Sequence, residues 1–291
     1  MKDYVVRGTD KSGNFRFFGS ITKDTVQTAA SHHQTSPVVT AGLGRTMTAV
    51  TMMSQMLKNE RDRISVTIKG DGPISGVIVE ANAKGNIKGY PYKANVDLPL
   101  NADGKLDVRG AFGNAVMTVM KDYGLKEPYI GQTILVSGEI AEDFTYYFAT
   151  SEQTPSAVAL GVLVDVDYSV KQSGGFIIQV LPDASDDAIT LLEENLKDFP
   201  SLTTQFEEGK TIEDIIESLL GDVTFWEKQE VQFCCDCSVD QMERGLISIG
   251  EKDLTEIIEE DKSADLACHF CNKHYIFEEK QLKDLLTEAR S

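Results

Sequence analysis

Four of the chain's five cysteines form two close pairs near the C-terminus. Cys235 and Cys237 are separated by one residue and Cys268 and Cys271 by two, and thirty residues (238–267) lie between the pairs. Two such pairs supply the four soft ligands that tetrahedral Zn²⁺ prefers, and each short pair lets the chain wrap one ion. The pattern therefore predicts one zinc ion per chain, bound by these four thiols. Because most four-cysteine sites are closed and structural, a passive zinc clip is the alternative to any further function.

The remaining potential ligands are expected to stay outside the metal shell. His269 and His274 could each replace a thiol, but four cysteines already complete a tetrahedral shell. Both histidines are therefore expected at the surface, or in contact with a ligating cysteine but not with the ion. Cys234 directly precedes the first ligand, and neighbours on an extended strand point in opposite directions. It is expected to be a bystander thiol, with an exchange of roles between Cys234 and Cys235 as the alternative.

The spacer between the two pairs is about twice as long as the spacer usual in a zinc ribbon, so it should contain structure of its own. Ser238 with Gln241 predicts a capping box that begins a short helix. Leu254, Ile257 and Ile258 indicate a second helix.

Charge is distributed unevenly along the chain. Residues 1–180 contain 18 Lys and Arg against 18 Asp and Glu, whereas residues 181–291 contain 10 against 28, which gives the net charge of −18. Phosphate binding needs clustered basic residues, so no nucleic-acid partner is expected. The start of the sequence has no apolar signal-like run, and no stretch of 18 or more residues is apolar enough to span a bilayer. No membrane partner is expected, and clustered cysteines favour a reducing, cytoplasmic location.

Residues 1–180 are predicted to form an α+β domain with a mixed or antiparallel sheet and helices. Strand patterns occur at 4–7, 14–21, 64–69, 74–80, 86–90, 115–120, 132–137, 157–164 and 175–181, and an amphipathic helix is expected at 139–151. The strands at 64–69, 74–80 and 86–90 are joined by short turns, which predicts an antiparallel meander. Strands and helices do not alternate regularly, so a doubly wound fold is not favoured.

A long helix is expected between Val38 and Lys58. Its apolar residues recur at helical spacing and include three methionines: Leu43, Met47, Val50, Met53 and Met56. Such a stripe can be an adaptable binding surface, but a helix packed in the interior shows the same pattern and is the favoured interpretation. The glycines of Gly42-Leu43-Gly44-Arg45 match neither a dinucleotide loop nor a phosphate loop, so this segment is assigned no ligand.

Residues 181–228 are predicted to form a linker of short acidic helices. One apolar stripe contains Ile189, Leu192 and Leu196, and another runs from Ile212 to Leu219. The linker contains 13 acids against 3 lysines, and its helices of ~10 to 14 residues are marginal in water without tertiary support. Although charge runs are usually only the solvated face of docked helices, the position between two domains favours a metastable linker.

Residues 229–291 are predicted to form a small zinc-binding, redox-switch domain. Structural zinc supplies on the order of 10–16 kcal/mol in small metal domains, whereas whole domains are stable by only ~5–15 kcal/mol. Loss of the ion should therefore unfold this region. Oxidation could remove the ion, because zinc-bound thiolates react with peroxide and each close pair contains its own resolving thiol.

The cysteine pattern resembles the signature of the redox-regulated 33 kDa heat-shock chaperone family. The matching residues are Phe233-Cys234-Cys235-Asp236-Cys237, the thirty-residue spacer, and Cys268-His269-Phe270-Cys271 followed by His274-Tyr275. Supporting similarity extends over the N-terminal region, at His32-His33-Gln34, Ser36-Pro37-Val38, Ala41-Gly42-Leu43-Gly44-Arg45 and Lys88-Gly89-Tyr90.

The resemblance implies an ATP-independent holdase that is inactive while reduced and zinc-bound. It implies that Cys235, Cys237, Cys268 and Cys271 bind zinc and that oxidation forms the disulfides Cys235–Cys237 and Cys268–Cys271. Zinc would then leave, the linker would unfold, and the exposed apolar surface would bind unfolding client proteins, with the activated chaperone forming a homodimer. Cys234 has no role in this pattern.

Two other classes of function remain as alternatives. An enzyme would need convergent acid, base and nucleophile groups, and no such motif surrounds His32, His33 or the isolated serines, so no catalytic residue is assigned. A constitutive zinc-clipped scaffold or regulator would keep its zinc under moderate oxidation and would not gain apolar surface.

Overall fold

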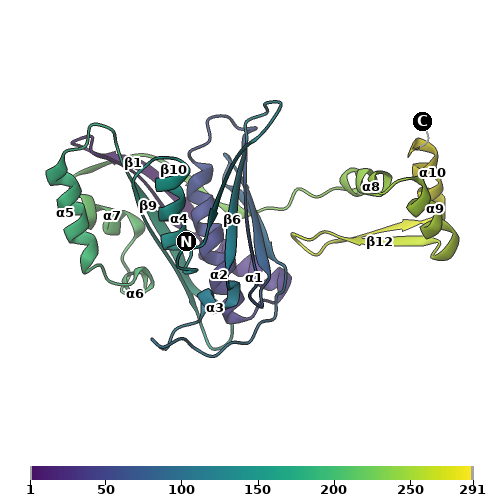
Figure 1. The fold of residues 1–291 in the computed structure, drawn as a ribbon, viewed down its shortest axis with the longest axis horizontal. Helices are drawn as coiled ribbons and strands as arrows, with labels where there is room; N and C mark the ends of the chain where they lie inside the picture. Colours follow the sequence, from purple (N-terminus) through teal and green to yellow (C-terminus); the bar gives the residue numbers. More distant parts are fainter. Residues whose placement is uncertain (1, 290–291) are drawn as a thin grey trace. The chain divides into compact units, whose positions relative to one another are not determined.

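The computed structural model describes residues 2–289 and contains two compact units that divide between Cys234 and Cys235 (Figure 1). The first unit consists of two sheets with seven helices, and the second of a hairpin with three helices. Both units mix helices with antiparallel strands, which confirms the predicted α+β class. No helix in residues 2–289 combines the length and apolar character that crossing a bilayer requires.

The first sheet is antiparallel throughout. Its strands, in spatial order, are β10 (Val223–Glu230), β1 (Tyr4–Asp10), β2 (Phe15–Ile21), β9 (Val170–Val180) and β8 (Ser156–Val164). Alternate residues of these strands face opposite sides, so the sheet buries apolar side chains on both faces.

The second sheet contains the predicted meander. Its strands, in spatial order, are β11 (Gln232–Phe233), β5 (Asn86–Pro91), β4 (Gly76–Asn82), β3 (Arg63–Gly70), β6 (Ala115–Asp122) and β7 (Tyr129–Ile134). Strands β3, β4 and β5 pair antiparallel in sequence order, as predicted, and only β11 joins the sheet in parallel, alongside β5.

The long helix α2 (Pro37–Ser54) packs against strands of both sheets and fills the space between them (Figure 1). Leu43, Met47, Val50 and Met53 are all buried, which confirms core packing and makes the alternative of a methionine-rich binding surface wrong. A side chain at Gly44 would come within 2.7 Å of Val26, so the glycine permits the close approach of neighbouring elements.

Four further helices complete the two faces of the first sheet. Helix α4 (Ala141–Thr150) lies where a helix was predicted, and α5 (Asp186–Lys197) and α7 (Ile212–Leu220) contain the two predicted apolar stripes. The short helix α6 (Leu202–Glu207) between them was not predicted. Helices α5, α6 and α7 cover the face of the first sheet that points away from α2 (Figure 1). Helices α1 (Lys23–His33) and α3 (Val108–Phe112) were not predicted, because α1 buries mostly small residues and α3 is one turn long.

The second unit is built around the hairpin of β12 (Ser263–Ala267) and β13 (His274–Glu278). Three helices pack with it: α8 (Val239–Ser248), α9 (Glu251–Glu260) and α10 (Glu279–Ala289). The capping box of Ser238 and Gln241 begins α8 as predicted, and Leu254 and Ile258 of α9 are buried. The expected start of the zinc-binding region at residue 229 lies inside β10, whereas the compact unit begins at Cys235.

Two predicted elements need correction. Residues 223–228 were expected to belong to a helical linker, but they form most of β10, which pairs with β1. Val223 and Phe225, two residues apart, both turn toward the core. Because charged residues follow them, the sequence shows no clear strand pattern here. The strand predicted at 132–137 lies instead at Tyr129–Ile134, because the amides of Val136 and Ser137 donate to the Asp143 carboxylate and leave the sheet.

Candidate metal centre

The four predicted thiols come together in the second unit. The Sγ atoms of Cys235, Cys237, Cys268 and Cys271 all lie within 4.8 Å of one another. Cys235 Sγ is 3.6 Å from Cys268 Sγ, and Cys237 Sγ is 3.5 Å from Cys271 Sγ. Sulfur ligands at about 2.3 Å from a tetrahedral zinc ion lie about 3.8 Å from each other. All four are free thiols, so the set fits a soft tetrahedral ion such as Zn²⁺.

The hairpin positions the second pair of thiols. Cys268 and Cys271 stand in the turn between β12 and β13, where the Cys268 amide donates to Lys273 O at 2.9 Å and the Asn272 amide donates to Cys268 O at 2.8 Å. Asn272 adopts the left-handed conformation (φ 56°), which asparagine tolerates and which closes the tight turn. The turn therefore holds both sulfurs on one side of the hairpin end.

The first pair lies in the irregular segment that precedes α8. The Ser238 hydroxyl accepts a hydrogen bond from the Gln241 amide, and the Gln241 side chain accepts one from the Ser238 amide. This capping box fixes where α8 begins. Cys237 directly precedes the capping residue, so its position is fixed as well. Cys268 is buried, and the other three thiols of the cluster are half-buried.

Burial and hydrogen bonding act differently on the individual thiols. Burial raises the pKa of the Cys235 and Cys271 thiols above the ordinary value. Burial also opposes ionisation of Cys237, but hydrogen bonds from the Tyr275 hydroxyl and from neighbouring thiols outweigh it and lower the pKa of Cys237. Cys237 is thus the sulfur whose thiolate the surrounding protein stabilises.

Tyr275 is a residue that the sequence did not assign to the site. Its hydroxyl lies 2.9 Å from Cys237 O and 3.1 Å from Cys237 Sγ, and donates toward both. The hydrogen bond to Cys237, followed by burial, raises the pKa of Tyr275 to about 12. In the structure Tyr275 and Phe277 are buried between exposed neighbours, but the sequence of β13 does not show this alternation, because the exposed Ile276 between them is also apolar.

The remaining candidate ligands lie outside the cluster. His274 is exposed, and its Nδ1 lies 2.9 Å from Asp265 Oδ1, across the hairpin. His269 is also exposed and is not one of the four clustered residues. Cys234 belongs to the first unit, where its amide donates to Ile87 O at 2.9 Å, and it too is not part of the thiol cluster.

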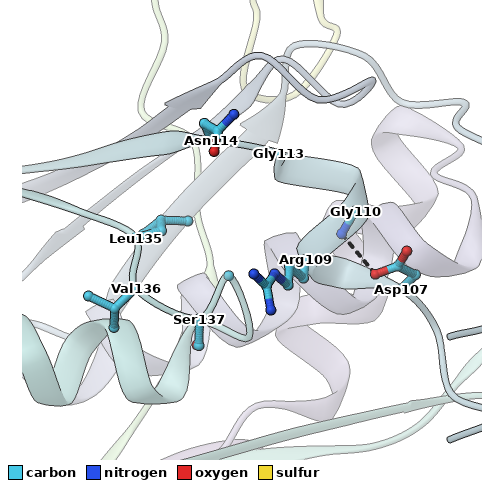
Figure 2. A pocket seen from close by; sticks show the side chains of 9 residues that line it. Asp107, Arg109, Gly110, Gly113, Asn114, Leu135, Val136 and Ser137 are labelled. Carbon is cyan, nitrogen blue, oxygen red and sulfur yellow. Dashed lines mark hydrogen bonds between the residues drawn. The ribbon is translucent and has the colours of Figure 1, made fainter. Parts of the chain in front are cut away.

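The first unit also contains a cavity with polar lining residues. It has a volume of about 390 Å³ and lies beside α3, with Asp107, Arg109, Asn114 and Ser137 among its lining residues (Figure 2). Asp107 caps α3 by accepting from the Gly110 amide at 2.8 Å, and the Ser137 hydroxyl accepts from the Glu139 amide at 3.0 Å. The Ser137 hydroxyl also donates to Asp143 Oδ2 at 3.4 Å, and the Asp143 carboxylate accepts hydrogen bonds from the backbone amides of residues 136, 137, 138 and 140. These groups are therefore engaged in local contacts that hold the start of α4.

Comparisons with known proteins agree with this combination of a large α+β unit and a four-thiol unit. The family model described as Hsp33 protein matches residues 3–278. The chain is 50% identical to the 33 kDa chaperonin of Ruminiclostridium cellulolyticum, with 99% of each chain covered. It is 47% identical to the 33 kDa chaperonin of Lachnoclostridium phytofermentans, covering 99% of this chain and 100% of the relative.

A solved structure shows the same fold. The crystal structure of the 33 kDa chaperonin (heat shock protein 33 homolog) from Thermotoga maritima matches with a TM-score of 0.92 and 34% identity, and 99% of each chain is covered. Fold and relatives together define a chaperone with a C-terminal cluster of four thiols. The chain belongs to the Hsp33 family, as its cysteine signature had suggested.

Proposed function

We propose that this chaperone is a redox-regulated, ATP-independent holdase. In the reduced form, one zinc ion bound by Cys235, Cys237, Cys268 and Cys271 keeps it inactive. Oxidation releases the ion and unfolds the C-terminal redox-switch domain and the linker of residues 181–228. The apolar surface exposed in this way binds unfolding proteins and prevents their aggregation. The observation that carries the proposal is the cluster of four free thiols within 4.8 Å of one another.

The chemical step is the oxidation of two thiol pairs. We assign the disulfides to Cys235–Cys237 and Cys268–Cys271. Each pair gives up two electrons and two protons, and one molecule of hydrogen peroxide accepts them and becomes two molecules of water. A disulfide sulfur no longer offers the thiolate that zinc requires, so metal affinity is lost. The Sγ–Sγ separations of 3.6 and 3.5 Å given above run between the pairs, so this connectivity rests on the family resemblance rather than on distance.

The chain offers a direct route from the thiols to the first unit. Strand β10 pairs with β1 and β11 pairs with β5, so residues 223–233 close one edge of each sheet. Two residues after β11, the chain reaches Cys235. If residues 235–289 unfold, residues 223–233 lose the folded unit that follows them in the chain. Exposed edge strands can then separate from their sheets at little cost in free energy.

The apolar surface that oxidation is proposed to expose lies between the linker helices and the first sheet. The sheet contributes six buried side chains to it: Tyr4, Val6, Phe15, Phe17, Phe176 and Ile178. The helices contribute seven: Leu192, Leu202, Phe206, Ile212, Ile215, Ile216 and Leu219. Burying one such aliphatic or aromatic side chain stabilises the docked state by about 1.5–3 kcal/mol. Release of the helices therefore exposes a large apolar surface that can bind apolar segments of other proteins.

Few polar side-chain contacts join helices α5, α6 and α7 to the first sheet. Glu213 of α7 accepts a hydrogen bond from the Tyr4 hydroxyl at 2.7 Å and pairs with Lys228 of β10 at 3.0 Å. Glu207 of α6 pairs with Lys171 at 3.5 Å through exposed side chains. Exposed ion pairs contribute little, so the acidic helices depend on their apolar contacts, and once detached their charge keeps them soluble.

The proposed partners follow from this switch. The activated chaperone binds unfolding proteins through apolar surface and forms a homodimer. It acts on them without catalysing a reaction, and neither nucleic acid nor a membrane is its partner. Free thiols that must bind zinc need a reducing compartment, which favours the cytoplasm.

The decisive experiment measures three quantities in the same samples: zinc released, free thiols remaining, and aggregation of a denatured client protein. As peroxide is increased under mild heat, all three should change together. Cys234→Ser is the matched control and should behave as the wild type, whereas Cys271→Ser should lose both zinc and the dose dependence. Peptide mapping of the oxidised chain identifies the disulfides. Zinc retention under moderate oxidation, or zinc release without slower aggregation, would favour the alternative of a constitutive zinc-clipped scaffold.

A further inference from the structure

A pocket in the first unit lies between the N-terminal residues, the start of α1 and the chain that connects β10 with β11. Its volume is about 480 Å³, which is within the range of small-molecule sites. Asp3, Asp24, Thr25 and residues 230–233 are among the residues that line it. All of its lining residues belong to the first unit, so the pocket does not depend on the position of the second.

Asp3 is a buried acid in this pocket, and only one of its carboxylate oxygens is satisfied. The residue is 3% exposed, and its Oδ2 accepts a hydrogen bond from the Thr25 amide at 2.6 Å, which caps the start of α1. Asp3 Oδ1 has no hydrogen-bond partner in residues 2–289, and neither has the buried Thr25 Oγ1. These are two of the four buried side-chain atoms without a partner in that range. Because buried polar atoms are normally paired, the cap alone does not account for Asp3.

The negative charge of the pocket lacks a compensating cation. Burial raises the pKa of the Asp3 carboxyl against the hydrogen bonds from Thr25, and the nearby Asp24 carboxylate adds to the increase. The Asp24 carboxylate forms no ion pair within residues 2–289. A bound cation would favour the ionised form of both acids.

The lysines of this pocket do not neutralise Asp3 and Asp24. Lys2 pairs with Glu230 at 2.9 Å and Lys84 pairs with Glu60 at 2.8 Å, through exposed side chains. The N-terminus of α1 contributes only about half a positive charge. The pocket therefore favours a cationic ligand. Exposed side chains such as those of the two lysines change rotamer within nanoseconds, which lets a slender ligand enter.

The lining favours an organic ammonium over a metal ion. Among residues 2–289, the four cysteines are the one group of three or more candidate ligands that lie close enough to hold a metal. An ammonium group carries three donors and needs fewer oxygens, which Asp3 Oδ1 and Thr25 Oγ1 supply at one end. Val231 and Phe233 add apolar side chains to the lining, against which methylene groups can pack. A linear aliphatic diamine or polyamine combines both kinds of group.

One wall of the pocket is the segment through which the first unit leads to the thiols. The Val231 amide donates to Asp3 O at 3.1 Å, and the Gln232 amide donates to Gly85 O at 3.0 Å. Phe233 ends β11, two residues before Cys235. A ligand that contacts both Asp3 and this segment binds only while the segment is docked, so it stabilises the docked state.

We propose that this pocket binds a small aliphatic diamine or polyamine, with one ammonium group at Asp3 Oδ1 and another at the Asp24 carboxylate, and that the bound amine holds residues 231–233 on the first unit. The binding site does not depend on chaperone activity. Its consequence for activation rests on the proposed function: if release of β11 follows unfolding of the second unit, a bound amine raises the peroxide dose that activation requires.

Isothermal titration calorimetry with spermidine tests the site in the reduced, zinc-bound full chain at about 0.15 M salt, where contacts between exposed charges are screened. Asp3→Asn keeps an oxygen for the Thr25 amide and removes the charge. Asp24→Asn removes the second charge at an exposed position, where folding is insensitive to the change. Glu127→Gln is the matched control, because it removes one charge from an exposed position outside the pocket. Zinc content and circular dichroism verify that each variant is folded.

Spermidine should bind at one saturable site. Asp3→Asn and Asp24→Asn should each weaken binding by about tenfold or more, whereas Glu127→Gln should stay within about twofold of the wild type. Magnesium chloride at the same ionic strength should not displace the amine. Absence of saturable binding, equal weakening by Glu127→Gln, or complete displacement by magnesium would overturn the site.

Hydrogen exchange at the Val231 amide tests the contact with the segment before Cys235. In the reduced chain, protection should rise by about tenfold at a spermidine concentration ten times its Kd. Unchanged protection with the amine bound would overturn this part of the proposal. The peroxide dose that suppresses client aggregation should rise with spermidine in the wild type but not in Asp3→Asn, and an equal dose in both would overturn the effect on activation. A wild type that never suppresses aggregation contradicts only the holdase, since binding and exchange are measured without a client.

Discussion

The two compact units bury very different amounts of apolar surface. Among the described residues, the core around α2 in the first unit contains 37 buried apolar side chains, whereas the core of the second unit contains eight, one of which is the candidate ligand Cys268. Small cores of this size rarely support a fold without a metal or a covalent link. The first unit is therefore stabilised by packing, and we expect the second to depend on a metal ion bound by its thiols.

A third core lies between these extremes. The surface shared by the first sheet and α5, α6 and α7 buries 13 side chains, but its helices carry most of the acids of residues 181–228. Both halves belong to the first unit, and the acidic helices are the half that we propose to be metastable. Stress should therefore affect the second unit first, the linker helices next and the α2 core last.

Removal of the metal should produce the largest difference between the units. A chelator withdraws on the order of 10–16 kcal/mol of apparent stabilisation from a small zinc-dependent fold, which is comparable to the whole stability of a typical domain, ~5–15 kcal/mol. Amide hydrogens of α9 and β13 should then exchange freely, while those of α2 stay protected. Hydrogen exchange before and after chelation is the measurement, and readdition of zinc is the control. Persistent protection in β13 without metal would contradict the dependence on thiols.

A core substitution should have the reverse effect. Phe112 is fully buried in the α2 core and stands against Gly42, so Phe112→Ala should destabilise the first unit by about 3–5 kcal/mol. Zinc content should be unchanged, because no candidate ligand lies in this unit. Denaturant unfolding gives the free energy, and a zinc-binding dye gives the metal content. Leu125→Ala, at an exposed position, is the control and should change stability little.

A change in the linker should separate client binding from oxidation. Ile216 of α7 is fully buried and its side chain stands directly over Gly19 of β2. Ile216→Ala should weaken docking of the linker by about 2 kcal/mol or more, so suppression of client aggregation should begin at a lower peroxide dose while zinc is still bound. Leu191→Ala on α5 is the matched control, because Leu191 is 58% exposed. An unchanged dose dependence for Ile216→Ala would show that the surface under the linker does not bind clients.

The sequence predicted elements well where one physical signal dominated. Alternation defined the meander of β3, β4 and β5, helical spacing defined α2, and hydroxyl capping defined the beginning of α8. The close pairs of cysteines likewise predicted which four thiols would come together, since the spacing of soft ligands is a local property.

The sequence failed where a tertiary partner decides the outcome. The second half of strand β10 carries charges at 227, 228 and 230, and Glu227 finds its partner, Arg7 at 2.5 Å, only once β10 lies beside β1. Tyr275 looked like an ordinary strand residue. Its hydrogen bond is to Cys237, which lies 38 positions earlier in the chain, so no local pattern around Tyr275 predicts it. Neither contact can be read from spacing alone.

The smallest expected effect concerns this hydrogen bond. Tyr275→Phe keeps the ring that packs in the second core and removes only the hydroxyl that lies 3.1 Å from Cys237 Sγ. The change should weaken zinc binding by about 1 kcal/mol, or roughly fivefold, and should raise the pKa of Cys237, whose thiolate then loses a donor. Competition with a chelator measures the affinity, and Tyr168→Phe in the first unit is the control. A wild-type zinc affinity in Tyr275→Phe would mean that Tyr275 acts only through packing. The hydroxyl would then contribute nothing to metal binding in the second unit.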